Sequence, residues 1–106
     1  QVAAVGMTED AAQRAGITTL CPKVSMSSAA GYALLRDDAP GQAQLVINAD
    51  TRQLLGATFV GTEVAELVHA ATVGIVGGLT IEQLWHAVPS YPTSSEVWLR
   101  LLDQCR

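Results

Sequence analysis

Glu96, in the stretch SYPTSSE at residues 90–96, carries a carboxylate that could take part in proton transfer with a bound substrate. The stretch also has a structural explanation, because Thr93 followed three residues later by Glu96 is the capping-box pattern of a helix start. Pro92 suits a chain that is extended and then turns into a helix. The pattern alone favours capping, and proton transfer needs further support.

Two cysteines and two histidines could also do chemistry, but their spacing matches no site pattern. Cys21 and Cys105 form no C-x-x-C pair, so neither a redox pair nor a zinc knuckle is indicated. Adding His69 and His86 gives no metal-ligand spacing, and we expect no metal site and two ordinary helix histidines. Unpaired cysteines and the lack of a signal segment are typical of a reducing compartment, which predicts a cytoplasmic location.

The composition predicts one folded domain. The chain has 106 residues, of which 49% are apolar, enough to bury a core. Its formal net charge is -4 and its charges are scattered, which argues against nucleic acid or an anionic membrane as partner. The most apolar run, ATVGIVGGL, is too short and glycine-rich to span a membrane. Because the chain starts at Gln1 and enters a strand-like segment at once, we expect a piece of a longer protein.

The first part of the chain is predicted to form a strand, a helix and a second strand. VAAVG is strand-like, and MTEDAAQRAG carries helix signals, with Thr8 as N-cap and Gly16 as the stop. ITTLCPKVSM is β-branched and apolar around a proline, which predicts an edge or irregular strand. The following stretch is ambiguous, since residues 32–35 could form a strand or a turn of helix, whereas residues 37–41 form a loop.

The middle of the chain predicts an antiparallel hairpin. QAQLVIN alternates, placing Ala43, Leu45 and Ile47 on one face, and LLGATFVG is a second strand of similar length. The residues between them, including Asp50 and Arg52, are compatible with a turn.

Three helices are predicted after the hairpin. From Thr62 apolar residues recur at helical spacing until Gly77–Gly78, and the second face carries small residues and little charge. A helix that is apolar on more than one side needs a second cover, which in so small a domain could belong to another chain. A capping box at Thr80 and Gln83 opens a short helix, and the last helix runs from Thr93. This order predicts an α+β fold, with helices packed on an antiparallel sheet.

Four segments in this order resemble one family: VAAVGMTEDAAQRAG, INADTRQLLGATFVGTEVAELVHAA, GLTIEQLWHAV and YPTSSE. They are similar to the C-terminal dimerisation domain of the pyridine nucleotide-disulfide oxidoreductases. That family includes dihydrolipoamide dehydrogenase, glutathione reductase, mercuric reductase and the soluble transhydrogenase. The resemblance spans residues 1–106 and is weakest between Met26 and Gln42.

The resemblance implies that residues 1–106 are a single dimerisation domain from a longer flavoprotein. The FAD- and NAD(P)-binding domains and the redox-active cysteine pair of the family lie upstream, so the fragment alone should bind neither cofactor and have no activity. VGIVGGL is not the glycine-rich dinucleotide fingerprint, and it ends a helix. Family members are homodimers, and the helix from Thr62 is the expected contact, through Leu67, Ala70, Ala71 and Gly74.

Tyr91 is the main departure from the family pattern. In disulfide-reducing members a histidine precedes the Pro-Thr pair and, with the glutamate equivalent to Glu96, acts as acid–base catalyst in the partner subunit's active site. The resemblance therefore places Tyr91 and Pro92 beside the FAD of the partner subunit. A histidine titrates near ~6.5 and a tyrosine near ~10, so the phenol is a poor base for a thiol at neutral pH. The parent protein is expected to reduce a quinone or another non-disulfide small molecule.

Three alternatives stay open. Tyr91 could be an interface aromatic without a chemical role. The parent could still be a true disulfide reductase such as dihydrolipoamide dehydrogenase. Mercuric reductases and soluble transhydrogenases also carry tyrosine at this place. Mercuric reductases have an additional cysteine pair near the C-terminus, whereas this chain has only Cys105 there, which argues against that class. Finally, the chain could be a stand-alone α+β module that merely dimerises.

Overall fold

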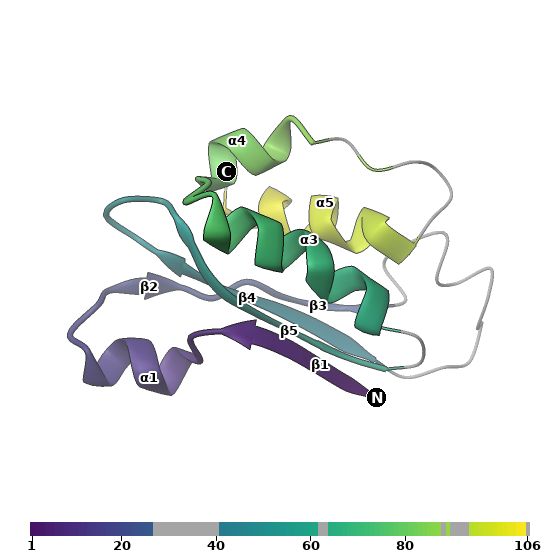
Figure 1. Cartoon of the computed structure of the whole chain (residues 1–106), viewed down its shortest axis with the longest axis horizontal. Helices are drawn as coiled ribbons and strands as arrows, with labels where there is room; N and C mark the ends of the chain where they lie inside the picture. Colours follow the sequence, from purple (N-terminus) through teal and green to yellow (C-terminus); the bar gives the residue numbers. More distant parts are fainter. Residues whose placement is uncertain (27–40, 62–63, 88, 90–93, 106) are drawn as a thin grey trace.

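A computed structural model describes residues 1–26, 41–61, 64–87, 89 and 94–105, which form one sheet and a layer of helices (Figure 1). The strands and helices are, in chain order, β1 (Val2–Gly6), α1 (Glu9–Arg14), β2 (Thr19–Leu20), β3 (Lys23–Ser25), β4 (Gln42–Asn48), β5 (Leu54–Val60), α3 (Ala65–Val76), α4 (Ile81–Trp85), the 3-10 turn η2 (Ser94–Glu96) and α5 (Val97–Asp103). The described strands make a five-stranded antiparallel sheet in the order β1-β5-β4-β2, with β3 also paired to β4. The predicted α+β class is confirmed.

The β4–β5 hairpin lies at the centre of the sheet, as predicted. Ala43 pairs with Phe59 and Leu45 pairs with Ala57. Ala43, Leu45 and Ile47 are all fully buried, which confirms the predicted inward face. Alternation of side chains along a strand explains why one face could be identified from sequence.

The outer strands also follow the prediction. β1 pairs with β5, and the ITTLCPKVSM segment forms β2 and β3, two short edge pieces on β4. Pro22 separates the two pieces because it has no N–H to donate, yet its carbonyl still accepts the Leu45 N–H at 3.1 Å.

Local capping signals are reproduced closely in α1. The Thr8 Oγ1 accepts the Ala11 N–H at 3.0 Å, as an N-cap should. Gly16 takes the left-handed conformation at φ 77°, and the N–H groups of Gly16 and Ile17 bond back to the carbonyls of Gln13 and Ala12. These two backbone hydrogen bonds end the helix, and they need the left-handed conformation that glycine adopts easily.

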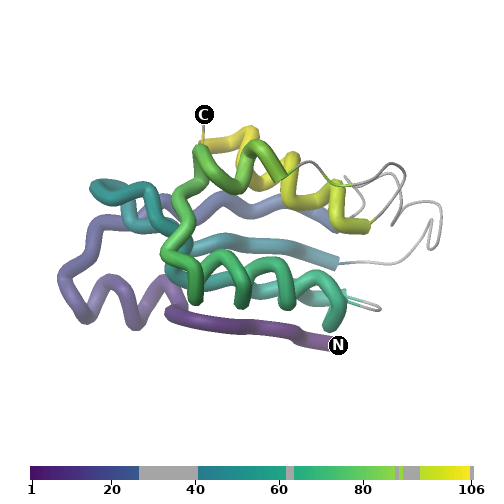
Figure 2. Tube along the Cα trace, turned by 45° about the horizontal axis from the view of Figure 1, so that its top comes forward, coloured from purple at the N-terminus to yellow at the C-terminus, as the bar shows by residue number. Residues whose placement is uncertain are grey.

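Helices α3, α4 and α5 form the layer that covers one face of the sheet (Figure 2). α3 packs over β5 and β1, whereas α5 packs over β3 and β4. Phe59 of β5 and Trp98 of α5 connect the part of the core under α3 with the part under α5, and their ring centroids lie 5.7 Å apart. The capping box predicted at Thr80 and Gln83 is present at the start of α4.

Some predictions fall outside the described residues. The ambiguous residues 32–35, most of the loop at 37–41, and the helix-start residues Thr62 and Thr93 belong to this group. In the part of the chain that the structure does describe, no helix is long and apolar enough to cross a membrane.

The tightest backbone packing lies where the last residue of β1 pairs with the first part of β5. Gly6 pairs with Gly56, and a Cβ on Gly56 would collide with the backbone carbonyl of Met7. That atom cannot move aside, because the Met7 N–H is bonded to the Leu55 carbonyl at 2.9 Å. Only glycine therefore fits at position 56.

We predict that Gly56→Ala lowers the free energy of unfolding by about 3 kcal/mol, since the methyl group forces the two strands apart. Gly16→Ala is the matched control, because a Cβ there meets nothing within 4 Å and only the positive φ is strained. It should cost about 1 kcal/mol. Chemical denaturation of both variants measures the difference, and equal losses would contradict this account of the β1–β5 crossing.

Candidate functional site

Glu96 is the one predicted catalytic residue that the structure describes, and it is buried. Its side chain is only 7% exposed, and among the described residues it is the only buried charged one. It closes η2 and occupies the N-cap position of α5, but its side chain makes no capping hydrogen bond to that helix. It takes part in a further polar interaction. Whether it completes a capping box with Thr93 stays a prediction, because Thr93 lies outside the described residues.

The two residues that follow Glu96 in the chain are apolar and buried. Val97 is fully buried, and Trp98 is 7% exposed and packs against Phe59 with the two rings tilted. The Trp98 Nε1 is buried and has no hydrogen-bond partner among the described residues. A carboxylate in such a place is costly unless it is paired, so Glu96 is not an ordinary solvated surface residue.

Tyr91 and Pro92, the other two predicted site residues, lie outside the described part of the chain. Residues on either side of them are described. Pro89 and Ser95 both line an apolar hollow of about 150 Å³, together with Ala70, Leu84, Ala87, Trp98 and Leu102. Pro89 and Ser95, which stand on either side of residues 90–93 in the sequence, thus line the same hollow between α3, α4 and α5.

The residues predicted for the subunit contact separate into two groups. Leu67, Ala71 and Gly74 are buried in the domain's own core, and a Cβ at Gly74 would lie 3.2 Å from the Leu54 Cδ2. Ala70 is exposed and lines the hollow. These three residues pack inside the domain, and their predicted part in the subunit contact stays a prediction. Val73, 52% exposed, lies on the outward side of α3 with Ala70.

The cysteines and histidines are not brought together as a catalytic group. Both cysteines are free thiols, and burial raises the pKa of Cys21 and of Cys105 above the ordinary value of 9.0. His69 and His86 are exposed. Among the described residues, no group of three or more potential ligands could hold a metal ion.

Arg52, predicted only as a turn residue, also contacts Glu82 and Cys105. Among the described residues it is the one non-glycine residue with positive φ, at 67°. Its Nε donates to the Glu82 Oε1 at 3.2 Å, and its Nη2 donates to the Cys105 carbonyl at 2.9 Å. These partners lie far along the chain, so local sequence carries no signal for them.

Comparison with known proteins decides the family. Residues 1–102 match the family described as pyridine nucleotide-disulphide oxidoreductase, dimerisation domain. The chain belongs to this family. The match covers the sheet, the helical layer and Glu96, and it confirms the family resemblance found in the sequence.

Curated relatives of this dimerisation domain are longer enzymes. A dihydrolipoyl dehydrogenase of Haloarcula marismortui is 35% identical over 91% of this chain and 20% of its own length. A mercuric reductase of Staphylococcus aureus is 34% identical over 90% of the chain and 17% of its own length, and a dihydrolipoyl dehydrogenase of Thermus scotoductus is 37% identical over 89% and 20%. The chain thus spans about a fifth of the length of these relatives.

Solved structures share the fold of the dimerisation domain. The Cu(II) complex of the flavoprotein disulfide reductase RclA from Escherichia coli aligns with a TM-score of 0.89 at 21% identity, over 99% of this chain and 24% of that one. A water-forming NADH oxidase from Lactobacillus brevis aligns with a TM-score of 0.82 at 19% identity, over 98% and 24%. At these identities the likeness shows the fold alone.

We predict that Glu96→Ala lowers the free energy of unfolding by about 2 kcal/mol, because it removes a buried polar group and leaves its surroundings unsatisfied. Glu96→Gln, which keeps the shape, should cost less than Glu96→Ala. Glu66→Ala is the control, since Glu66 is exposed and also lies in the first turn of a helix. Denaturant titration measures all three, and a neutral Glu96→Ala would show that the carboxylate has no structural role.

Proposed function

We propose that this chain is the subunit-contact domain of a homodimeric, FAD-dependent NAD(P)H oxidoreductase. The observation that carries the proposal is the family match over residues 1–102, supported by relatives that are about five times as long. In this proposal the cofactor-binding domains belong to the rest of the parent protein. A stand-alone interaction module is the weaker reading, because it would not explain why the relatives are multidomain enzymes. A cytoplasmic location stays a prediction.

The described residues fit a domain that touches cofactors only across a subunit contact. A dinucleotide site needs a glycine-rich turn between a strand and a helix. Gly77 and Gly78 instead follow the helix α3, and Gly78 takes a left-handed φ of 64° at its end. This geometry supports the proposal that FAD and NAD(P) are held elsewhere in the parent.

The outward side of α3, with the hollow beside it, is the proposed contact surface. Ala70 and Val73 are exposed there, and the hollow is lined almost wholly by apolar side chains. Apolar surface of this kind is best covered by a second subunit. In this proposal, dimer formation brings Tyr91 and Pro92, which lie in the sequence between the hollow-lining residues Pro89 and Ser95, to the partner's flavin.

Within that arrangement Tyr91 and Glu96 have different roles. The Tyr91 hydroxyl donates a hydrogen bond toward the bound acceptor but cannot serve as a base at neutral pH. Glu96, buried at the start of α5, orients the segment that carries Tyr91. FAD, when bound, supplies the hydride acceptor, and electron delivery to a quinone-like molecule needs no thiol proton shuttle. The proposed substrate is therefore a non-disulfide acceptor.

A true dihydrolipoyl dehydrogenase is the second candidate. It is favoured by the relatives of that name, which reach 37% identity with this chain. The position of Tyr91 argues against it, because the family's disulfide-reducing members carry histidine there.

Tyr91→His in the full-length parent separates the two candidates. If the missing base limits disulfide chemistry, the variant should raise lipoamide turnover by about 100-fold, the lower end of what a positioned acid–base group contributes. Glu96→Gln in the same background should remove most of that gain. Tyr91→Phe controls for the aromatic ring and should leave lipoamide turnover at the starting value.

The second candidate prevails if the unaltered parent already reduces lipoamide as its best substrate and Tyr91→His gives no gain. Steady-state assays with NADH and NADPH, each with lipoamide and with a soluble quinone, provide the readout.

A further inference from the structure

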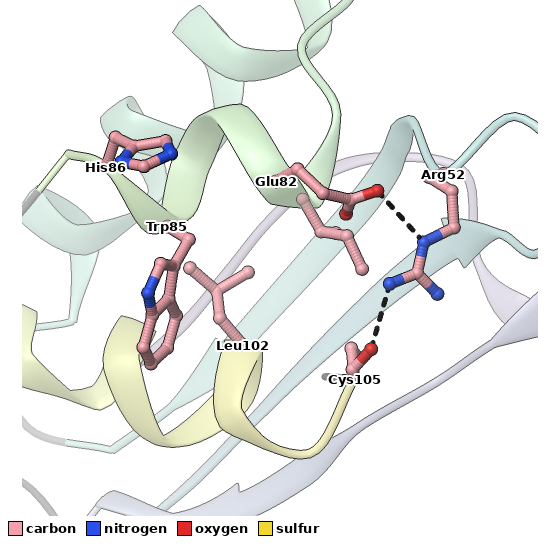
Figure 3. A pocket seen from close by; sticks show the side chains of 7 residues that line it. Arg52, Glu82, Trp85, His86, Leu102 and Cys105 are labelled. Atoms are coloured by element: carbon pink, nitrogen blue, oxygen red, sulfur yellow. Dashed lines mark hydrogen bonds and ion pairs between the residues drawn. The ribbon is translucent and has the colours of Figure 1, made fainter.

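A second cavity lies between the β4–β5 turn, α4 and the C-terminal end of α5 (Figure 3). Its volume is about 280 Å³, near the lower end for small-molecule sites. Ile81 and Leu102, both buried, form its floor. Figure 3 shows Arg52 and Glu82 at one end and Trp85 and His86 at the other, with Leu102 between them. The cavity therefore has an ion pair at one end and two aromatic rings at the other.

The polar end is held in place by Arg52. The guanidinium is fixed by the Glu82 carboxylate and by the Cys105 carbonyl, at 3.2 Å and 2.9 Å. A guanidinium has five N–H donors, and these two bonds use two of them. The remaining donors are presented by a side chain that is only 33% exposed. Such a fixed and partly desolvated donor suits an acceptor atom of a ligand.

The backbone of Arg52 supports a role beyond the turn itself. Glycine or asparagine takes a left-handed turn position at little cost, whereas arginine is strained there. The side-chain contacts to α4 and α5 offset that strain and point the guanidinium to the cavity. Strain at a residue that lines a cavity is a recognised mark of a functional position.

The charge balance decides what kind of acceptor fits. Glu82 already neutralises Arg52, so a ligand does not need a negative charge, and a second carboxylate would be repelled by Glu82. The Cys105 thiol adds no charge, because burial raises its pKa and keeps it protonated at neutral pH. A neutral carbonyl oxygen needs no opposite charge from Arg52 and is not repelled by Glu82. The flat side chain of Trp85 at the other end favours an aromatic ring.

We propose that this cavity binds a small neutral aromatic carbonyl compound, with its oxygen on the Arg52 guanidinium and its ring over Leu102, beside Trp85. The site does not depend on the proposed oxidoreductase function, since its residues are separate from Tyr91 and Glu96. Binding needs no chemical step.

The test is a titration of the full-length parent protein, isotope-labelled at its methyl and indole groups, by nuclear magnetic resonance with acetophenone, benzoate and benzylammonium as matched probes. Acetophenone should shift the signals of Ile81, Trp85 and Leu102 and show nuclear Overhauser contacts to the Leu102 methyl groups. Benzoate should bind at least about tenfold more weakly, which is the effect of one unfavourable charge contact. A melting curve first confirms that each variant is folded.

Two substitutions test the polar end directly. Arg52→Gly keeps the turn conformation and should weaken acetophenone binding about tenfold, the worth of a hydrogen bond from a charged donor. Arg14→Gln removes the same charge from α1, away from the cavity, and should leave binding unchanged. Glu82→Gln frees the Arg52 charge and should strengthen benzoate binding about tenfold.

The proposal is overturned if acetophenone causes no shifts up to its solubility limit, or if the shifts lie outside the cavity. Equal binding of all three probes, unaffected by Arg52→Gly and Glu82→Gln, would also overturn it, because the polar end would then play no part.

Discussion

The buried face of the β4–β5 hairpin is the contact on which the rest of the domain depends. Leu45 and Phe59 are fully buried there, and two helices pack onto it, α3 over β5 and α5 over β4. Burying such side chains is the main favourable term in folding. The tilted contact between the Phe59 and Trp98 rings joins this face directly to the first turn of α5.

That contact also explains where the candidate site lies. Because Val97 and Trp98 are anchored in the core, the residue before them, Glu96, is drawn below the surface. The hollow beside α3 is lined by Ser95 and Trp98, which stand on either side of Glu96 in the sequence.

The sequence predicted what depends on local chemistry or on strict alternation. Thr8, Gly16 and Thr80 act through bonds to residues three to five positions away, so their capping roles were visible in the sequence. Ala43, Leu45 and Ile47 follow the two-residue period of a strand.

What the sequence missed depends on contacts between distant segments. The burial of Ala71 and Gly74 comes from the packing of α3 on β5 and β1, which the local pattern of small residues does not reveal. Their predicted part in the subunit contact stays a prediction. The hydrogen bonds from Arg52 to Glu82 and to the Cys105 carbonyl join residues that are 30 and 53 positions apart in the chain. No local pattern encodes such pairs, and they emerge only when the helices dock.

The central claim is that the outward side of α3 forms the subunit contact of the parent flavoprotein, and light scattering of that protein across a dilution series tests it most directly. Val73→Glu places a charge on this side, and Val2→Glu places the same charge on another exposed valine, in the edge strand β1. The account predicts a dimer that Val73→Glu converts to a monomer and Val2→Glu leaves intact. A parent that is monomeric throughout, or a dimer that survives Val73→Glu, would contradict it.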